Sequence, residues 1–306
     1  MAEITASMVK DLREMTGAGM MDAKNALVEN KGNMDAAVDW LRKKGLAKAA
    51  KKSGRTAAEG LVAIATKGTK GAVIELNSET DFVSRNSEFQ DFVQKVAAAA
   101  LGTKNVEELA QAKLDGKTVQ EQLTDLIAKI GENMTLRRSK TLDVSQGTVV
   151  GYVHSALAPN LGKIGVLVAL ESSAPADKLM ETGKQIAMHI AAANPEYLSI
   201  ADIDPAKLER ERSVLKEKHL ASGKPADKID NIVEGDLRKN FYGQICLLEQ
   251  TFVIDGKTRI ADVLAQAGKV VGAEIKLKEF ARFQLGDGIE KEETDFAAEV
   301  AKAANG

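Results

Sequence analysis

Residues 75–86 offer the clearest chemistry in this 306-residue chain, because they place a carboxylate beside an aromatic ring. Apolar residues at 71–76 predict a strand, and the helical spacing of apolar residues after it predicts a helix. Asp81 and Phe82 therefore fall on a strand-to-helix turn, where a rigid scaffold usually presents side chains to partners. A packing role competes with this interpretation, because Phe82 could contact Phe89 seven residues later and Asp81 or Thr80 could cap the next turn.

Two Gly-Lys-Thr triplets, at 116–118 and 256–258, resemble part of a phosphate-binding loop. Gln111 and Thr251 occupy the positions where such a loop requires its first glycine. The preceding aspartate makes each triplet typical of a turn. Residues 17–22 similarly lack the third glycine and the preceding strand of a dinucleotide-binding fold.

Other enzymatic patterns are missing from the sequence. Its three histidines and its cysteine show no metal-ligand spacing, and no Gly-x-Ser-x-Gly nucleophile motif occurs. His189 lies on an Ala-rich helix and is expected to be a buried, hydrogen-bonded residue. We therefore expect no covalent catalysis, no metal site and no bound cofactor. The histidines and the cysteine are His154, His189, His219 and Cys246.

The composition favours a protein partner. The 42 basic and 44 acidic residues leave a net charge of −2, which gives no general attraction to nucleic acid or anionic membranes. A single cysteine excludes an internal disulfide and fits a reducing compartment. The sequence shows neither a signal-peptide pattern nor an uninterrupted apolar run of about 18 residues. These features predict a cytoplasmic protein.

Three short helices are predicted within the first 45 residues, with Asn33 as the N-cap of the third and Gly45 as its end. So short a region buries only a small core, so we expect it to depend on its neighbours. The apolar faces consist of Met8, Val9, Leu12 and Met15, then Met20, Ala23 and Leu27, then Met34, Ala37, Val38 and Leu41.

A basic stretch follows at 42–55, and its Ala and Lys content predicts a solvated helical linker. RNA binding is the alternative. It is disfavoured because no aromatic residue interleaves to stack on bases.

The centre contains a weak internal repeat. A strand at 72–76, a loop and an Ala-rich helix are echoed by a strand at 166–170, a loop and a second Ala-rich helix. The repeat predicts two similar α+β subdomains. Residues 172–175 lack the Thr-Asp-Phe-Val turn of the first copy. The last strands of the sheets are predicted at 244–252 and 274–285.

An antiparallel helical hairpin is predicted as an insertion before these last strands. Asp204 and Pro205 form a favourable helix start, residues 222–225 form a turn, and an apolar stripe marks the second helix. A final helix is predicted after residue 288 and carries Phe296 and Val300. The stripe consists of Ile229, Ile232, Val233 and Leu237.

Residues 12–24 and 75–86 closely resemble the two signatures of the bacterial elongation factor Ts family, and further similar segments extend over essentially the whole chain. The resemblance implies an α+β fold with an N-terminal ubiquitin-associated-like three-helix domain, two related core subdomains, an inserted helical hairpin and a C-terminal helix. The implied divisions are 1–55, 56–140, 141–285 with the hairpin at 201–240, and 286–306. The further similar segments are 129–133, 164–168, 288–291 and 294–300.

The resemblance also implies a function: guanine-nucleotide exchange on elongation factor Tu, a GTPase. Such a factor must bind the GTPase better without nucleotide than with it, so it needs no nucleophile. Phe82 is the implied wedge and Asp81 its polar companion. Thr80 and Val83 complete the motif that displaces Mg²⁺ from the partner.

Further contacts with elongation factor Tu are implied for three other segments, and the hairpin is implied to mediate self-association as a homodimer or a 2:2 complex. Ser155 follows the segment that contains His154, at a position where the family commonly has glycine. An RNA- or ribosome-binding module and a small-molecule enzyme are the competing functions. The implied contact residues are Met20, Met21 and Lys24, then Ile130 and Gly131, then His154.

Overall fold

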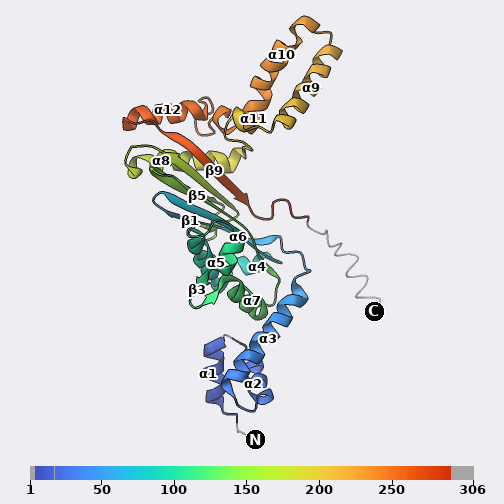
Figure 1. Ribbon diagram of the computed structural model, residues 1–306, viewed down its shortest axis with the longest axis vertical. Coiled ribbons are helices and arrows are strands. Elements are labelled where there is room, and N and C mark those ends of the chain that lie inside the picture. Colours follow the sequence, from blue (N-terminus) through green and yellow to red (C-terminus); the bar gives the residue numbers. More distant parts are fainter. Residues whose placement is uncertain (1–3, 17, 291–306) are drawn as a thin grey trace.

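A computed structural model describes residues 4–16 and 18–290. The described chain is elongated, with a three-helix module at one end, two sheets in the middle and a helical hairpin at the other end (Figure 1). This arrangement of helices and sheets confirms the predicted α+β class. The predicted final helix with Phe296 and Val300 lies outside the described residues.

The N-terminal module consists of α1 (Ala6–Thr16), α2 (Met20–Glu29) and α3 (Met34–Lys52). Asn33 caps α3 as predicted, since its side chain accepts a hydrogen bond from the N–H of Ala36. Met15 and Met20 were expected on the apolar faces, but both side chains are exposed. The small core consists of Leu12, Ala23, Ala26, Leu27 and Ala37.

Helix α3 continues through Gly45 to Lys52, so the predicted end at Gly45 is wrong. Gly45 is buried where α3 packs on α7 (Val119–Ile130), and a Cβ built on Gly45 would lie 3.5 Å from that of Ala128. The lack of a side chain there favours close contact between the two helices. Tertiary packing therefore overrides the usual helix-ending preference of glycine.

The basic residues of α3 hold the module to the rest of the protein. Arg42 pairs with Glu121 on α7, and the Lys52 ammonium donates a hydrogen bond to the carbonyl of Gly131 at the end of α7. The predicted linker is helical as far as Lys52 and largely exposed, but Arg42 and Lys52 also bind it to α7. These pairings also leave fewer unpaired charges for RNA.

The first sheet has the strand order β5-β2-β1-β7, with all pairs antiparallel. Helix α5 (Ser87–Ala100) and α7 cover its outer face, and Phe89 and Leu61 are buried between them. The strands are β1 (Glu59–Lys67), β2 (Lys70–Ser78), β5 (Met134–Asp143) and β7 (Leu161–Gly162). Smaller elements nearby are α4 (Asp81–Ser84), α6 (Val106–Gln111), β3 (Lys113–Leu114) and β4 (Lys117–Thr118).

The second sheet has the antiparallel order β6-β8-β9, formed by β6 (Gly147–His154), β8 (Ile164–Glu171) and β9 (Lys276–Gln284). Helix α8 (Ala176–Ala193) and α12 (Ile260–Val271) share a core with its outer face. The predicted repeat therefore corresponds to β2 with α5 and β8 with α8.

The strand predicted at 244–252 is wrong. This segment forms two short helical turns, α11 (Gly243–Ile245) and η4 (Leu247–Glu249), held by local bonds such as Cys246 N–H to Tyr242 C=O at 2.9 Å. Ile245, Cys246 and Leu247 are all buried in succession, so the segment lacks the alternation of a half-buried strand.

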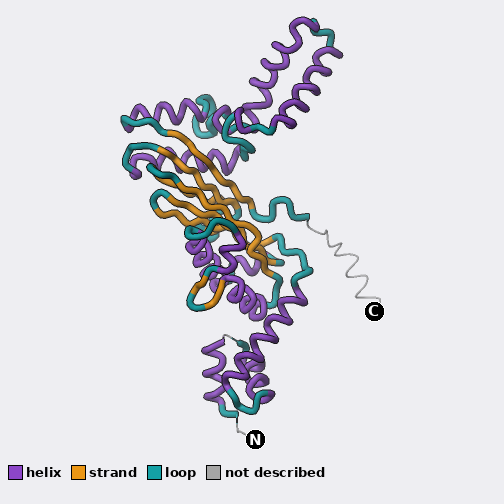
Figure 2. The backbone as a smooth tube through the Cα atoms, in the orientation of Figure 1, coloured by secondary structure: helices purple, strands orange, loops and turns teal. Residues whose placement is uncertain are grey.

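The two sheets pack face to face through their inner surfaces (Figure 2). Alternate residues of β1 divide between the two cores: Leu61 faces the helices, whereas Val62 faces the other sheet. A Cβ on Gly165 of β8 would approach Val62 Cγ1 within 2.7 Å, which shows how closely the sheets meet. The result is four layers in the order helix, sheet, sheet and helix.

The predicted hairpin is present, formed by α9 (Pro205–Ala221) and α10 (Ile229–Asp236) and followed by the π-helical segment η3 (Leu237–Tyr242). Asp204 caps α9 as predicted. The apolar stripe of α10 packs inside the hairpin, where Val233 and Leu237 share a core with Leu215. Two short 3-10 turns, η1 (Ile200–Asp202) and η2 (Ala226–Lys228), flank α9 in the chain.

Candidate partner-binding site

The turn after β2 exposes the ring of Phe82. Asp81 to Ser84 form the one-turn helix α4, and the Phe82 side chain is 76% exposed. Val83 is buried in the core, and the Ser84 hydroxyl donates a 2.8 Å hydrogen bond to the carbonyl of Gly60. The alternative in which Phe82 packs against Phe89 is therefore wrong. The turn is anchored by Val83 and Ser84 while the ring faces solvent.

Thr80 joins this turn to the end of α7. Its N–H and its hydroxyl donate to the two carboxylate oxygens of Glu132, at 2.9 and 2.7 Å. Thr80 occupies the N-cap position of α4, yet its side chain makes no capping hydrogen bond. Asp81 is exposed, 3.9 Å from Arg85. The Thr80 side chain therefore positions the turn rather than capping a helix.

A second pair of contacts lies beside the first. The carboxylate of Glu79 accepts a hydrogen bond from the N–H of Asn133 and lies 3.4 Å from Arg55. The Asn133 amide donates in turn to the Arg55 carbonyl at 2.7 Å. Residues 79–80 are thus bound to residues 132–133, although about fifty positions separate them in the chain.

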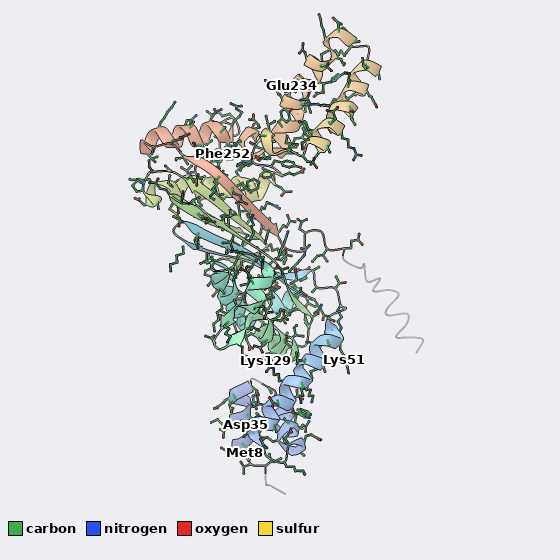
Figure 3. All side chains as sticks on the ribbon, viewed as in Figure 1. Met8, Asp35, Lys51, Lys129, Glu234 and Phe252 are labelled. Atoms are coloured by element: carbon green, nitrogen blue, oxygen red, sulfur yellow. The ribbon has the colours of Figure 1, made fainter. Side chains whose placement is uncertain are left out.

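These contacts bring the predicted Phe82 turn close to the predicted contact segment at Ile130 and Gly131. Gly131 ends α7 with φ of 91°, a left-handed conformation that favours glycine. On the same side, Lys129 of α7 pairs with Glu88 at the start of α5 at 2.7 Å, and Figure 3 labels Lys129 at this end of the helix.

The sequence alone predicts no role for Glu79, Glu132 or Asn133. The only indication in the sequence is that two polar residues, Glu132 and Asn133, directly follow the helix end at Gly131. Their partners, however, follow only from the folded arrangement.

Met20, Met21 and Lys24 are exposed on α2 of the N-terminal module, and the two methionines are 62% and 65% exposed. Asp22 lies between Met21 and Lys24 in the chain and pairs with Lys44 and Lys48 of α3, each at 2.9 Å. Hydrogen bonds from these lysines lower the pKa of Asp22. The structure does not bring this surface together with Phe82, because α2 lies beyond the junction of α3 with α7 (Figure 1).

His154 ends β6 in the second sheet. Its exposed ring places Nδ1 3.1 Å from the Tyr152 hydroxyl. Ser155 follows with φ of 53°, in the left-handed region. This conformation gives a physical reason for glycine at the corresponding position in the family.

The remaining titratable candidates have structural partners. Burial lowers the pKa of His189, whose Nε2 lies 2.9 Å from Gln250 Oε1 and whose Nδ1 accepts from the N–H of Val253. Burial also raises the pKa of the Cys246 thiol to about 11. Within residues 4–16 and 18–290, no group of three or more His, Cys, Asp or Glu side chains is arranged to hold a metal ion.

Both Gly-Lys-Thr triplets follow turns, as predicted. Asp115 and Gly116 have positive φ between β3 and β4, and Asp255 accepts hydrogen bonds from the N–H groups of Lys257 and Thr258. The glycine of each triplet therefore lies in a turn, with positive φ, and not in a phosphate-binding loop.

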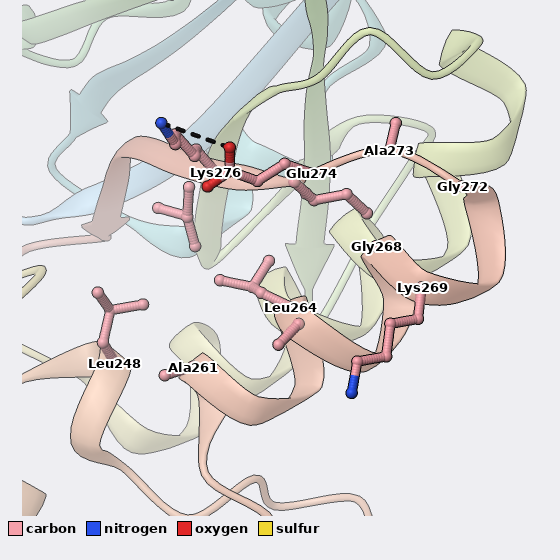
Figure 4. Close-up of a pocket in the computed structure, with 12 residues that line it drawn as sticks. Leu248, Ala261, Leu264, Gly268, Lys269, Gly272, Ala273, Glu274 and Lys276 are labelled. Atoms are coloured by element: carbon pink, nitrogen blue, oxygen red, sulfur yellow. Dashed lines mark ion pairs between the residues drawn. The ribbon is translucent and has the colours of Figure 1, made fainter.

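An open groove of about 750 Å³ lies between α12 and the start of β9 (Figure 4). Leu264 and Leu277 contribute to its apolar lining, and Glu274 and Lys276 form an ion pair of 3.6 Å at its side.

Within the part of the chain that the structure describes, no helix is both long and apolar enough to cross a membrane.

Comparison with known proteins adds the family. The sequence model of the family described as "Elongation factor TS" matches residues 79–287. The chain is 62% identical to an elongation factor Ts of Rhodospirillum rubrum, with 98% of each chain covered. It is 61% identical to one of Rhodospirillum centenum, covering 99% of this chain and all of that protein. It is 56% identical to one of Bradyrhizobium diazoefficiens, covering 99% of each. The chain therefore belongs to the elongation factor Ts family and is a translation elongation factor of protein biosynthesis.

Proposed function

We propose that the chain is a guanine-nucleotide exchange factor for elongation factor Tu. It binds elongation factor Tu with GDP, displaces Mg²⁺ and promotes GDP release, so that GTP binds in its place. The observation that supports this proposal most strongly is the 76% exposed Phe82 ring on an otherwise anchored turn. As a translation factor, the protein acts in the cytoplasm.

The energetics of the turn suit a wedge. Moving a phenylalanine ring from water into an apolar site yields about 1.5–3 kcal/mol, and here that gain is available to the complex because Phe82 is unburied. Val83 and the bonds of Thr80 and Ser84 already order the backbone around the ring. The turn therefore loses less conformational entropy on binding than a disordered loop would.

Exchange follows from linkage between two binding equilibria. If the factor binds the nucleotide-free GTPase more tightly than the GDP form, GDP must bind the complex more weakly by the same factor. Mg²⁺ bridges the nucleotide phosphates in the GTPase, so displacing the elements that hold this ion weakens both contacts. No covalent step is required of the factor.

The predicted residues divide by their environment. Phe82 and Asp81 are exposed and are proposed to contact the partner. Thr80 and Val83 face the protein itself and are proposed to hold the turn in position. Ile130, at the end of α7 next to the turn, extends the same contact.

Two more contact regions are proposed: Met20, Met21 and Lys24 on the N-terminal module, and His154 on the second sheet. Because α3 packs on α7, the first of these regions is held at a set distance from Phe82. Rigid spacing lets two weak contacts reinforce each other on one partner. The hairpin at 201–240 is proposed to mediate self-association, as a homodimer or within a 2:2 complex.

The proposal is tested with elongation factor Tu loaded with fluorescent GDP. Adding the chain and excess GDP should accelerate the fluorescence change strongly at millimolar Mg²⁺. The added acceleration should shrink when EDTA removes Mg²⁺ in advance, because the ion is then already gone. Release that is unaffected by the chain contradicts the function, whereas an acceleration that EDTA leaves unchanged contradicts Mg²⁺ displacement.

A further inference from the structure

A buried carboxylate lies at the junction of the two sheets. Glu75 of β2 is 0% exposed and is paired with Arg137 at 3.1 Å and Arg138 at 2.5 Å. It also accepts hydrogen bonds from the amide of Asn77 at 2.9 Å and from the N–H of Gly286 at 2.8 Å. One side chain thus binds three segments that are far apart in the sequence: β2, β5 and the chain after β9.

Two consecutive arginines reach the same carboxylate because the β2–β5 ladder is irregular there. Glu75 is opposite Arg138 and Leu76 is opposite Leu136, so Arg137 is an extra residue on β5. In a regular strand, neighbouring side chains point to opposite faces, whereas a bulge redirects one of them. The carboxylate therefore stabilises the bulged register by pairing with both arginines.

The cluster also holds the chain after β9. Arg137 donates to the Asp287 carbonyl at 2.6 Å, and Arg138 donates to the Gln284 carbonyl at 2.9 Å. Gly286 has φ of 72°, and a Cβ there would approach the Ala58 carbonyl oxygen within 2.6 Å. This segment is therefore closely fitted against the start of β1.

The cluster is costly in free energy. Burial disfavours the charge on Glu75, and hydrogen bonds from Gly286, Asn77 and Arg138 outweigh this effect and lower its pKa. Asn77 Oδ1 is buried with no hydrogen-bond partner among the described residues, which costs about 1–3 kcal/mol. A well-packed apolar group often replaces a buried ion pair without loss of stability. Stability alone therefore does not explain why a charged cluster occupies this place, whereas a role in positioning the neighbouring strands does.

The register that Glu75 holds leads directly to the Phe82 turn. From the bulge, the ladder runs through Thr135 opposite Asn77 to Met134 opposite Ser78. The next residues along the two strands are Glu132, Asn133, Glu79 and Thr80, which form the hydrogen bonds that fix the turn. A shift of one residue in β5 would move Glu132 away from Thr80.

We propose that Glu75 is a positioning residue for nucleotide exchange: with Arg137 and Arg138 it fixes the bulged register of β5 that places Glu132 against Thr80 and so orients Phe82. This inference rests on the proposed exchange function. It assigns Glu75 no contact with the partner.

The test compares Glu75→Leu and Glu75→Gln with Glu279→Gln. Glu279 is a matched control, because it also links β5 and β9, through Lys140 at 2.7 Å, but its side chain is half-exposed and Lys140 lies opposite Val73, outside the bulge between Arg138 and Leu136. Two quantities are measured on the folded fraction: amide hydrogen exchange in the peptide that contains Thr80, and the maximal rate of GDP release at saturating factor. Saturation separates the exchange step from partner affinity.

Glu75→Leu should raise amide exchange at Thr80 and lower the maximal release rate about tenfold or more, since small misplacements of a reacting group have effects of this size. Glu75→Gln, which keeps the shape but loses the charge, should have a smaller effect in the same direction. Glu279→Gln should match the wild type.

Two results for Glu75→Leu would overturn the inference. In the first, the amide protection of Thr80 and the rate of GDP release both equal those of the wild type. In the second, Thr80 loses its protection but the release rate is unchanged. A wild-type chain that fails to accelerate release at all would instead refute the proposed function. If Glu75→Leu does not fold, the milder Glu75→Gln decides between these outcomes.

Discussion

Thr80 and Glu132 form a two-point contact, with the N–H of Thr80 at 2.9 Å from one carboxylate oxygen and its hydroxyl at 2.7 Å from the other. Fifty-two positions separate the two residues in the chain. The contact fixes the residue that begins the Phe82 turn to the segment after α7. The orientation of the exposed ring thus depends on a carboxylate that belongs to a different element.

Glu132→Ala should destabilise the protein by about 1–3 kcal/mol, because it leaves two half-buried donors of Thr80 without their acceptor. Thr80→Val should cost less, since it removes only the hydroxyl. In urea unfolding of both single variants and the double variant, we expect a positive coupling energy. Asp125→Ala breaks an exposed pair with Lys117 and is the control, with an expected cost of about 0–1 kcal/mol. Strictly additive effects at Thr80 and Glu132 would contradict the coupling.

Met21→Glu should leave folding unchanged, because the side chain is exposed on α2, yet should weaken binding to nucleotide-free elongation factor Tu. Loss of an apolar interface anchor typically costs about 1–2 kcal/mol. Val270→Glu changes a more exposed apolar residue on α12, outside the proposed contact surfaces, and serves as control. Calorimetric titration measures both affinities. Equal affinity of the two variants would remove the N-terminal module from the proposed contact.

Local features of the fold were readable from the sequence. The sequence predicts Asn33 and Asp204 as helix caps, and each accepts the expected backbone hydrogen bond. Such signals act over three or four residues, so they depend little on the rest of the fold. The Phe82 turn was placed correctly between strand and helix for the same reason.

Features set by tertiary packing were not readable. Helix α3 passes through Gly45 because a flat surface is needed against Ala128. Residues 244–252 were predicted as a strand because short apolar runs fit a strand and a buried helical turn equally well. The Glu132 contact with Thr80 depends on the bulge at Arg137, and a bulge is not predicted by the alternation of apolar residues.

The hairpin provides a test of self-association. Val214→Asp and Leu220→Asp on α9 should favour monomers, because both side chains are exposed apolar groups on the proposed dimerisation element. Val233→Asp should instead unfold the hairpin, since Val233 is buried between the helices. Sedimentation velocity measures assembly and circular dichroism checks folding. Exchange should persist in the monomer; an unchanged assembly state in the folded α9 variants contradicts the assignment.

Stability should decrease as the pH falls below about 6.5, through His189. Burial lowers the pKa of the folded-state ring, so the unfolded chain takes up a proton on His189 first. The unfolded state then binds more protons, and the free energy of unfolding rises with pH in this range. Above about pH 7 the ring is neutral in both states and the effect vanishes.

Urea unfolding between about pH 5 and pH 7.5 measures this slope. His189→Asn should reduce it, whereas His154→Gln, which changes an exposed histidine, should retain the wild-type slope. A slope that is the same in His189→Asn and the wild type would show that another group is responsible.

GDP release by Phe82→Ala decides whether the Phe82 ring acts by contacting the partner or by packing in the core of its own protein. Val270→Ala, which truncates another exposed apolar side chain, is the control. We expect an unfolding midpoint equal to that of the wild type and a release rate lower by about tenfold to a hundredfold, as for an interface hot spot. A Phe82→Ala variant that releases GDP as fast as the wild type, or that loses activity only in proportion to lost folded protein, would contradict the contact of the ring with the partner.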